Sequence, residues 1–138
     1  MKTLKIFLGT SLFILASLFY GCEKNTYFQL ESSVKKKIEK RWQLVRVAEN
    51  EPVEDWVFSK GKVYRISGIT NDTVDIGDYA VKTTLLDAFV TISNFKEVVY
   101  HLNTKYTIEE LDDKILVIFG NDEVNGGGTI YKEFTVKK

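Results

Sequence analysis

Short apolar stretches that alternate with polar residues recur along most of this 138-residue chain, and they limit its fold more than any other feature. They occupy residues 41–48, 55–58, 62–67, 78–84, 88–92, 97–102, 105–111, 114–119 and 129–136. A period of two is typical of strands with one buried face, and turn residues such as Gly61 and Asp112 separate the stretches. No second helical pattern is long enough for the crossovers that parallel strands need. The sequence therefore predicts an all-β, antiparallel sandwich or barrel.

One segment with helical spacing precedes these stretches. In the sequence LESSVKKKIEKRW, one stripe is formed by four apolar residues spaced four apart: Leu30, Val34, Ile38 and Trp42. Ser32 or Ser33 is the expected N-cap. We therefore expect one short amphipathic helix that runs into the first strand.

The N-terminus carries the pattern of an export signal. A basic start is followed by an apolar run from Ile6 to Phe19 that contains no charge. This run is shorter than the roughly 20 residues that a transmembrane helix needs, and its layout is that of a secretory signal. It ends in LFYGC, where Gly21 precedes Cys22, the one cysteine of the chain. A core helix with a buried free cysteine is the alternative.

The LFYGC ending resembles the lipobox of bacterial lipoproteins. In that family the cysteine is acylated and becomes the first residue of the mature chain. The resemblance implies a signal peptide over residues 1–21, a lipidated tether over 22–29 with the lipid on Cys22, and a folded domain over 30–138. It also implies a protein anchored to a membrane of the bacterial cell envelope, which we expect to be the outer membrane.

The folded part is similar to the small lipocalin-like domains found in lipoproteins of Bacteroidetes. The similarity rests on five segments: KRWQLVRV, WVFSKGKVY, GDYAV, YTIEELDDKILVIF and TIYKEFTV. It implies an up-and-down β-barrel of about eight strands, a size that encloses side chains or one small ligand. Lys40 stands where lipocalins proper carry a glycine, so the similarity is to the looser family.

The residues that carry catalysis or metal binding are scarce. His101 is the single histidine, the chain has no G-x-S-x-G motif, and Cys22 is assigned to the lipid. Without a cluster of His and Cys ligands we expect no metal, no cofactor and no enzymatic activity. The signal removes two of the 19 basic residues and none of the 19 acidic ones, which leaves a net charge of −2. Nucleic acid is therefore not an expected partner.

Two kinds of binding remain open. The first is a small apolar ligand inside the barrel, lined by Trp42, Trp56, Tyr79 and Phe134. The second is a protein-interaction or inhibitor module that uses the loops 68–77 and 120–128. An empty apolar cavity would favour the first, and a filled core would favour the second.

Two further patterns bear on the surface. The stretch ILVIF (115–119) is apolar on both faces, so either the helix or a partner protein is expected to cover its outward side chains. The sequence NDTV resembles the motif that Bacteroidetes glycosylate on a hydroxyl group, which predicts O-glycosylation of Thr73.

Overall fold

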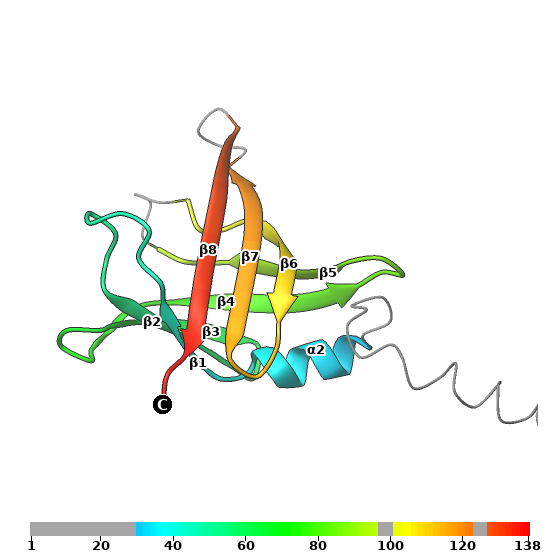
Figure 1. Ribbon diagram of the computed structural model, residues 1–138, viewed down its shortest axis with the longest axis horizontal. Coiled ribbons are helices and arrows are strands. Elements are labelled where there is room, and N and C mark those ends of the chain that lie inside the picture. Colours follow the sequence, from blue (N-terminus) through cyan, green and yellow to red (C-terminus); the bar gives the residue numbers. More distant parts are fainter. Residues whose placement is uncertain (1–29, 97–100, 123–126) are drawn as a thin grey trace, which may run out of the picture.

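The computed structural model describes residues 30–96, 101–122 and 127–138. Within them the chain forms the helix α2 (Glu31–Ile38) and eight strands. The strands are β1 (Arg41–Leu44), β2 (Glu54–Ser59), β3 (Lys62–Ser67), β4 (Thr73–Thr83), β5 (Ala88–Ser93), β6 (Lys105–Leu111), β7 (Ile115–Asp122) and β8 (Gly128–Val136). Each pairs with the next in antiparallel fashion, and β8 pairs with β1 to close the barrel (Figure 1). The predicted up-and-down barrel with one short helix is confirmed.

The barrel closes along a short seam between the first and last strands. Only three residue pairs form it: Trp42 with Val136, Gln43 with Thr135 and Leu44 with Phe134. The first strand ends at Leu44 and not at residue 48 as predicted. Val45 still donates its N–H to Glu133 O, and the chain then leaves the sheet.

The helix α2 begins two or three residues earlier than its sequence suggested. Leu30 is the N-cap residue, and no side chain caps the helix, so the prediction of Ser32 or Ser33 at this position is wrong. Both serines lie inside the helix and are exposed to solvent. The predicted stripe is only partly buried, because Val34 and Ile38 are in the core whereas Leu30 is exposed.

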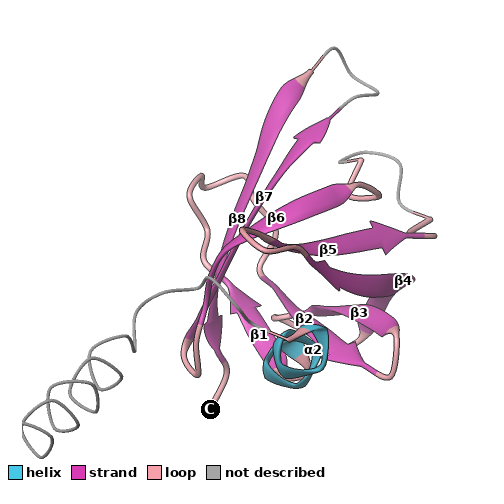
Figure 2. Cartoon of the chain, turned by 90° about the vertical axis from the view of Figure 1, so that its right-hand side faces the viewer, coloured by secondary structure: helices cyan, strands magenta, loops and turns pink. Residues whose placement is uncertain are grey.

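The helix closes one end of the barrel, where it packs against β4 and β6 (Figure 2). Trp42 donates its indole N–H to Ile38 O at 2.8 Å, which joins the end of the helix to β1. The Tyr79 hydroxyl donates to Glu39 Oε1 at 2.8 Å, which joins the end of the helix to β4. Burial, together with the Glu39 carboxylate, raises the pKa of Tyr79, so this hydroxyl keeps its proton.

Several strand boundaries differ from the prediction. The fourth strand is longer than expected because Gly77 lies inside it, where an added Cβ would meet Ser93 O at 2.7 Å. The expected strand 97–102 is wrong at His101 and Leu102, which lie outside strands, and its other residues lie outside the described ones.

In the described parts of the chain no helix has the length and apolarity to cross a membrane.

Candidate functional site

The barrel interior contains all four aromatic residues predicted to line a ligand pocket. Trp42, Trp56, Tyr79 and Phe134 are buried. The ring centroids of Trp56 and Phe134 lie 5.2 Å apart, and those of Phe58 and Tyr79 lie 5.1 Å apart, as in packed aromatic pairs. These residues therefore pack on their core neighbours, and their role as ligand-binding residues stays a prediction.

A buried ion pair lies inside the barrel at the end away from α2. Arg65 stands opposite Trp56 in the β2–β3 register, so it points inward with the Trp56 side chain. Its Nη2 lies 2.8 Å from Glu54 Oε2, and both side chains are almost fully buried. Trp56 donates its indole N–H to Glu54 Oε1 at 2.8 Å, and the Arg65 guanidinium lies 5.7 Å from the Phe95 ring centroid. The charge of each partner is thus compensated within the core.

A cavity of about 60 Å³ borders this ion pair. Its lining residues are Glu51, Pro52, Glu54, Arg65, Leu102 and Lys132. Lys132 Nζ lies 3.0 Å from Glu51 Oε1. Partial burial acts to raise the pKa of Glu51, but the Val47 N–H and Lys132 outweigh it and hold this pKa below its usual value. The cavity has room for a few water molecules, whereas ligand pockets measure about 300–1,000 Å³.

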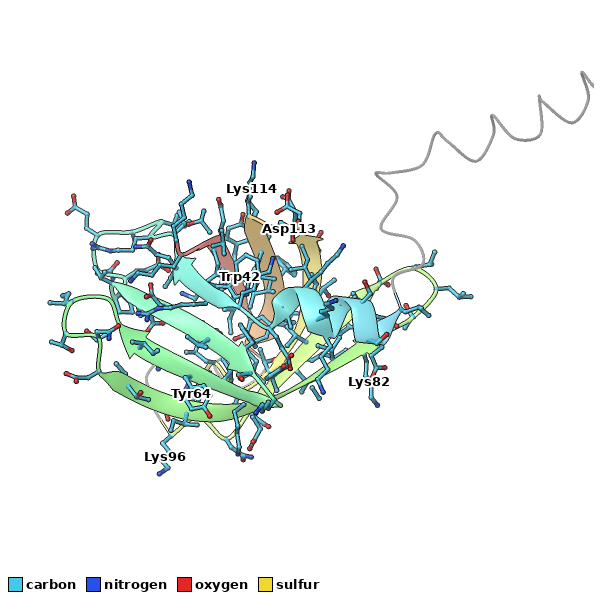
Figure 3. The ribbon with its side chains drawn as sticks, turned by 90° about the horizontal axis from the view of Figure 1, so that it is seen from below. Trp42, Tyr64, Lys82, Lys96, Asp113 and Lys114 are labelled. Carbon is cyan, nitrogen blue, oxygen red and sulfur yellow. The ribbon has the colours of Figure 1, made fainter. Side chains whose placement is uncertain are left out.

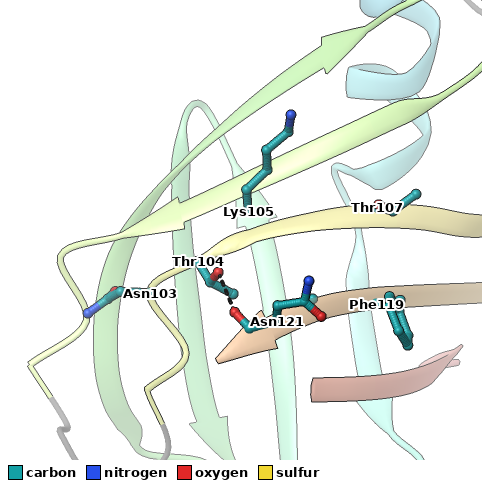
Figure 4. A pocket seen from close by; sticks show the side chains of 7 residues that line it. Asn103, Thr104, Lys105, Thr107, Phe119 and Asn121 are labelled. Carbon is teal, nitrogen blue, oxygen red and sulfur yellow. Dashed lines mark hydrogen bonds between the residues drawn. The ribbon is translucent and has the colours of Figure 1, made fainter. Parts of the chain in front are cut away.

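A larger hollow of about 440 Å³ lies on the outer face of the barrel, over β6 and β7 (Figure 4). We call it the outer groove, and its lining residues are Asn103, Thr104, Lys105, Thr107, Phe119, Gly120 and Asn121. Thr104 Oγ1 donates to Asn121 O at 3.1 Å, which fixes the two strands at this point. None of the seven lining residues is acidic. The groove therefore offers amides, hydroxyls, one ammonium group and one aromatic ring.

The outer groove lies on a row of side chains that crosses four strands. The β-sheet register places Phe89, Thr107, Phe119 and Tyr131 side by side on β5, β6, β7 and β8. We call these four residues the aromatic row. Neighbouring strands are about 4.8 Å apart, so the row spans about 14 Å. Phe119 and Tyr131 are 37% and 45% exposed, which is enough for a ligand to contact both rings.

Charged neighbours fix the two ends of the aromatic row. Lys105 Nζ lies 3.8 Å from the centroid of the Phe89 ring, which holds a positive charge over that ring. At the other end the Tyr131 hydroxyl donates to Glu133 Oε2 at 3.3 Å. Loss of water around this hydroxyl and the negative charge of Glu133 raise the pKa of Tyr131. The Tyr131 hydroxyl is thus neutral at physiological pH.

The stretch ILVIF divides between the two faces of β7. Leu116 and Ile118 point into the core, and Phe119 belongs to the outer face. The helix packs on β4 and β6, so the prediction that it covers the outward side chains of this stretch is wrong. Phe119 is left accessible at the outer groove.

The other predicted sites lie elsewhere. Thr73 is exposed at the start of β4, and its glycosylation stays a prediction. The predicted binding loops 68–77 and 120–128 are shorter than expected, because 73–77 belong to β4 and 120–122 to β7. Cys22 lies outside the described residues, and its acylation stays a prediction.

The single histidine does not lie in a strand. His101 has a backbone φ of 41°, in the left-handed region, and is half-buried. Across residues 30–96, 101–122 and 127–138, no three His, Cys, Asp or Glu residues are grouped so that they could hold a metal ion.

Comparison with known proteins returned nothing: no protein-family model, no curated protein and no solved structure matches this chain.

Sequence reasoning missed the outer groove and the aromatic row. Alternation along 105–111 and 129–136 identifies Lys105, Thr107 and Tyr131 as one parity of their strands. It does not say which residues of different strands are neighbours. That information lies in the register, which pairs Thr107 with both Phe89 and Phe119.

Proposed function

We propose that this protein is a lipid-anchored, non-catalytic binding protein of the bacterial cell envelope that binds a neutral, hydroxyl-rich ligand, such as an envelope glycan, in the outer groove. The observation that carries the proposal is the combination of a packed interior with an accessible groove of about 440 Å³ on the outer face. A groove of this size is within the range of ligand sites.

The chemistry of the outer groove supports a sugar-like ligand. Asn103 and Asn121 offer both donors and acceptors, and Thr107 adds a hydroxyl group. Such groups exchange hydrogen bonds with ligand hydroxyls, while the exposed face of Phe119 packs against the C–H groups of a sugar ring. An anionic ligand is less suited to the groove, because Lys105 is its one cationic lining residue and lies over Phe89.

The packed interior argues against the carrier hypothesis. The rings of Trp56 and Phe134 contact each other, and the cavity beside Glu54 and Arg65 is about 60 Å³. A small apolar ligand would have to displace these side chains, which costs packing energy. The hypothesis of a protein-interaction module is compatible with the surface of the barrel. The contact surface would then be the outer groove and not the loops 68–77 and 120–128.

The groove is tested with Phe119→Ala and a matched control, Tyr64→Ala. Tyr64 is a half-buried aromatic residue on β3 and does not line the groove (Figure 3). Native electrophoresis through gels that contain dextran, mannan or β-glucan measures binding as retarded migration. We expect the wild type to be retarded by at least one polysaccharide and Phe119→Ala to bind about tenfold more weakly, equivalent to about 1.4 kcal/mol.

Tyr64→Ala should bind like the wild type. A wild type that no polysaccharide retards, or equal losses in the two variants, would contradict the glycan proposal. Capture of an envelope protein that is lost with Phe119→Ala alone would replace the glycan by a protein ligand.

The lipid anchor is tested with Cys22→Ser. We expect the wild type to fractionate with membranes, to lack residues 1–21 and to carry acyl chains on Cys22. Each buried CH₂ contributes about 0.8 kcal/mol, and more than one chain is needed for a stable anchor. Mass spectrometry of Cys22→Ser should show an uncut, unacylated precursor, whereas the neighbouring change Asn25→Ser should be processed like the wild type. A wild type that is itself uncut and unacylated would refute the anchor.

A further inference from the structure

The turn between β4 and β5 presents two adjacent leucines to solvent. Leu85 is 73% exposed and Leu86 is 68% exposed. The turn is held by its own hydrogen bonds, from Thr84 N to Asp87 O at 2.8 Å and from Asp87 N to Thr84 Oγ1 at 3.0 Å. Folding of the turn therefore does not depend on the leucine side chains, which are available for contact with another surface.

A third exposed leucine and several lysines lie at the same end of the molecule. Figures 1 and 3 show the β4–β5 hairpin extending beyond the barrel on the side where α2 begins. Leu30, at the start of α2, is 75% exposed. Lys35 and Lys36 are exposed on α2, and Lys82 is exposed on β4. We call this set the apolar–basic end: Leu30, Lys35, Lys36, Lys82, Leu85 and Leu86.

The expected lipid anchor lies close to this end in the sequence. Cys22 precedes Leu30 by eight positions, and an extended chain spans at most about 3.6 Å per residue, so the tether reaches at most about 29 Å. An acyl chain on Cys22 would therefore hold the apolar–basic end near the membrane surface. The opposite end of β4, which follows the turn that contains Ile69, lies farther from the start of α2 (Figure 1).

We infer that the apolar–basic end docks on an anionic lipid bilayer, with Leu85, Leu86 and Leu30 in the interfacial layer and the lysines at the headgroups. The inference rests on the proposed lipid anchor and adds a fixed orientation to it. Leucines flanked by lysines match the two layers of a membrane surface, which is apolar inside and negatively charged outside.

A second copy of the chain fits this surface less well. A two-fold contact would place the same patch on itself and bring lysines of both copies together. Exposed acidic residues also lie at this end: Glu31, Asp87, and Glu109 and Glu110 at the end of β6. What favours a membrane over self-association is the short tether between this end and the expected acyl chain on Cys22.

The orientation has a consequence for the outer groove. The 84–87 turn precedes β5, whereas Asn103 and Asn121 lie near the start of β6 and the end of β7, at the other end of these strands. With the apolar–basic end on the bilayer, this part of the groove points away from the lipid and stays open to ligands.

The test uses the full chain, matured in cells, extracted in detergent and reconstituted into vesicles of phosphatidylcholine with phosphatidylglycerol. Leu85→Cys is labelled with an environment-sensitive fluorophore, and Ile69→Cys is the matched control, since Ile69 is 81% exposed. We expect the emission of the label at position 85 to shift to shorter wavelength and to lose intensity when the lipids carry brominated chains. The label at position 69 should show neither effect. In the labelled Leu85→Cys chain, Lys35→Glu/Lys36→Glu should reduce the quenching on these vesicles and not on phosphatidylcholine alone.

The outcomes separate this inference from the anchor itself. If the anchor is absent, the protein does not float with the vesicles and Cys22 takes up the label as well. If the anchored protein floats but positions 85 and 69 behave alike, the docking inference is overturned. A wavelength shift that follows protein density and ignores lipid composition would assign the surface to a second copy and would also overturn the inference.

Discussion

Replacement of Arg65 by Met is expected to lower the free energy of unfolding by about 3–5 kcal/mol. Arg65 Nη2 lies 2.8 Å from Glu54 Oε2 inside the barrel, and both side chains are almost fully buried. Met fills much of the same space but leaves the Glu54 carboxylate with the Trp56 indole as a neutral donor. An uncompensated buried charge accounts for the cost, which urea denaturation followed by tryptophan fluorescence measures.

The companion variant Glu54→Gln/Arg65→Met removes both charges and separates charge from packing. A glutamine at position 54 can still accept the hydrogen bond from Trp56, so the double variant should recover a large part of the loss. If it is as unstable as Arg65→Met alone, lost packing is the cause. If the midpoint of urea unfolding is the same for Arg65→Met as for the wild type, the ion pair does not stabilise the barrel.

The second large effect is expected from Ile38→Asp. Ile38 is fully buried between α2 and the barrel, so an aspartate here places a charge in an apolar contact. We expect a loss of at least about 2 kcal/mol. Thermal unfolding measures it, with Leu30→Asp as the control, because Leu30 belongs to the same sequence stripe and is 75% exposed. The control should change stability by no more than about 0.5 kcal/mol. Equal melting of both variants and the wild type would show that α2 does not contribute to closing the barrel.

The barrel could be predicted because its strands obey the period of two. The segments 62–67 and 105–111 match β3 and β6 residue for residue. Two of the errors arise at glycines in the predicted loops 68–77 and 120–128, Gly77 and Gly120. Gly120 lies inside β7, where an added Cβ would meet the Tyr106 ring at 2.8 Å. A glycine that makes room for an aromatic ring on the next strand and a glycine in a turn look alike in a sequence.

The candidate site was harder to predict than the fold. The aromatic row requires the register of four strands, and a bulge between Ile108 and Glu110 shifts the β6–β7 register by one residue. A one-residue shift moves every side chain to the other face, and loop sequences do not specify it. The ion pair was not predicted because Glu54 lies just outside the predicted strand 55–58. The alternation pattern therefore did not show that the Glu54 side chain points into the barrel.

The seam between β1 and β8 sets the order in which the molecule can fold. Trp42 and Val136 must meet before the barrel is closed, although they are separated by nearly the whole domain. A chain that emerges residue by residue from its N-terminus cannot form this contact until the last strand is available. Contacts between such distant segments also slow folding. A chain whose last strand has not yet emerged thus stays open along this seam, and closure of the barrel is postponed until β8 is available.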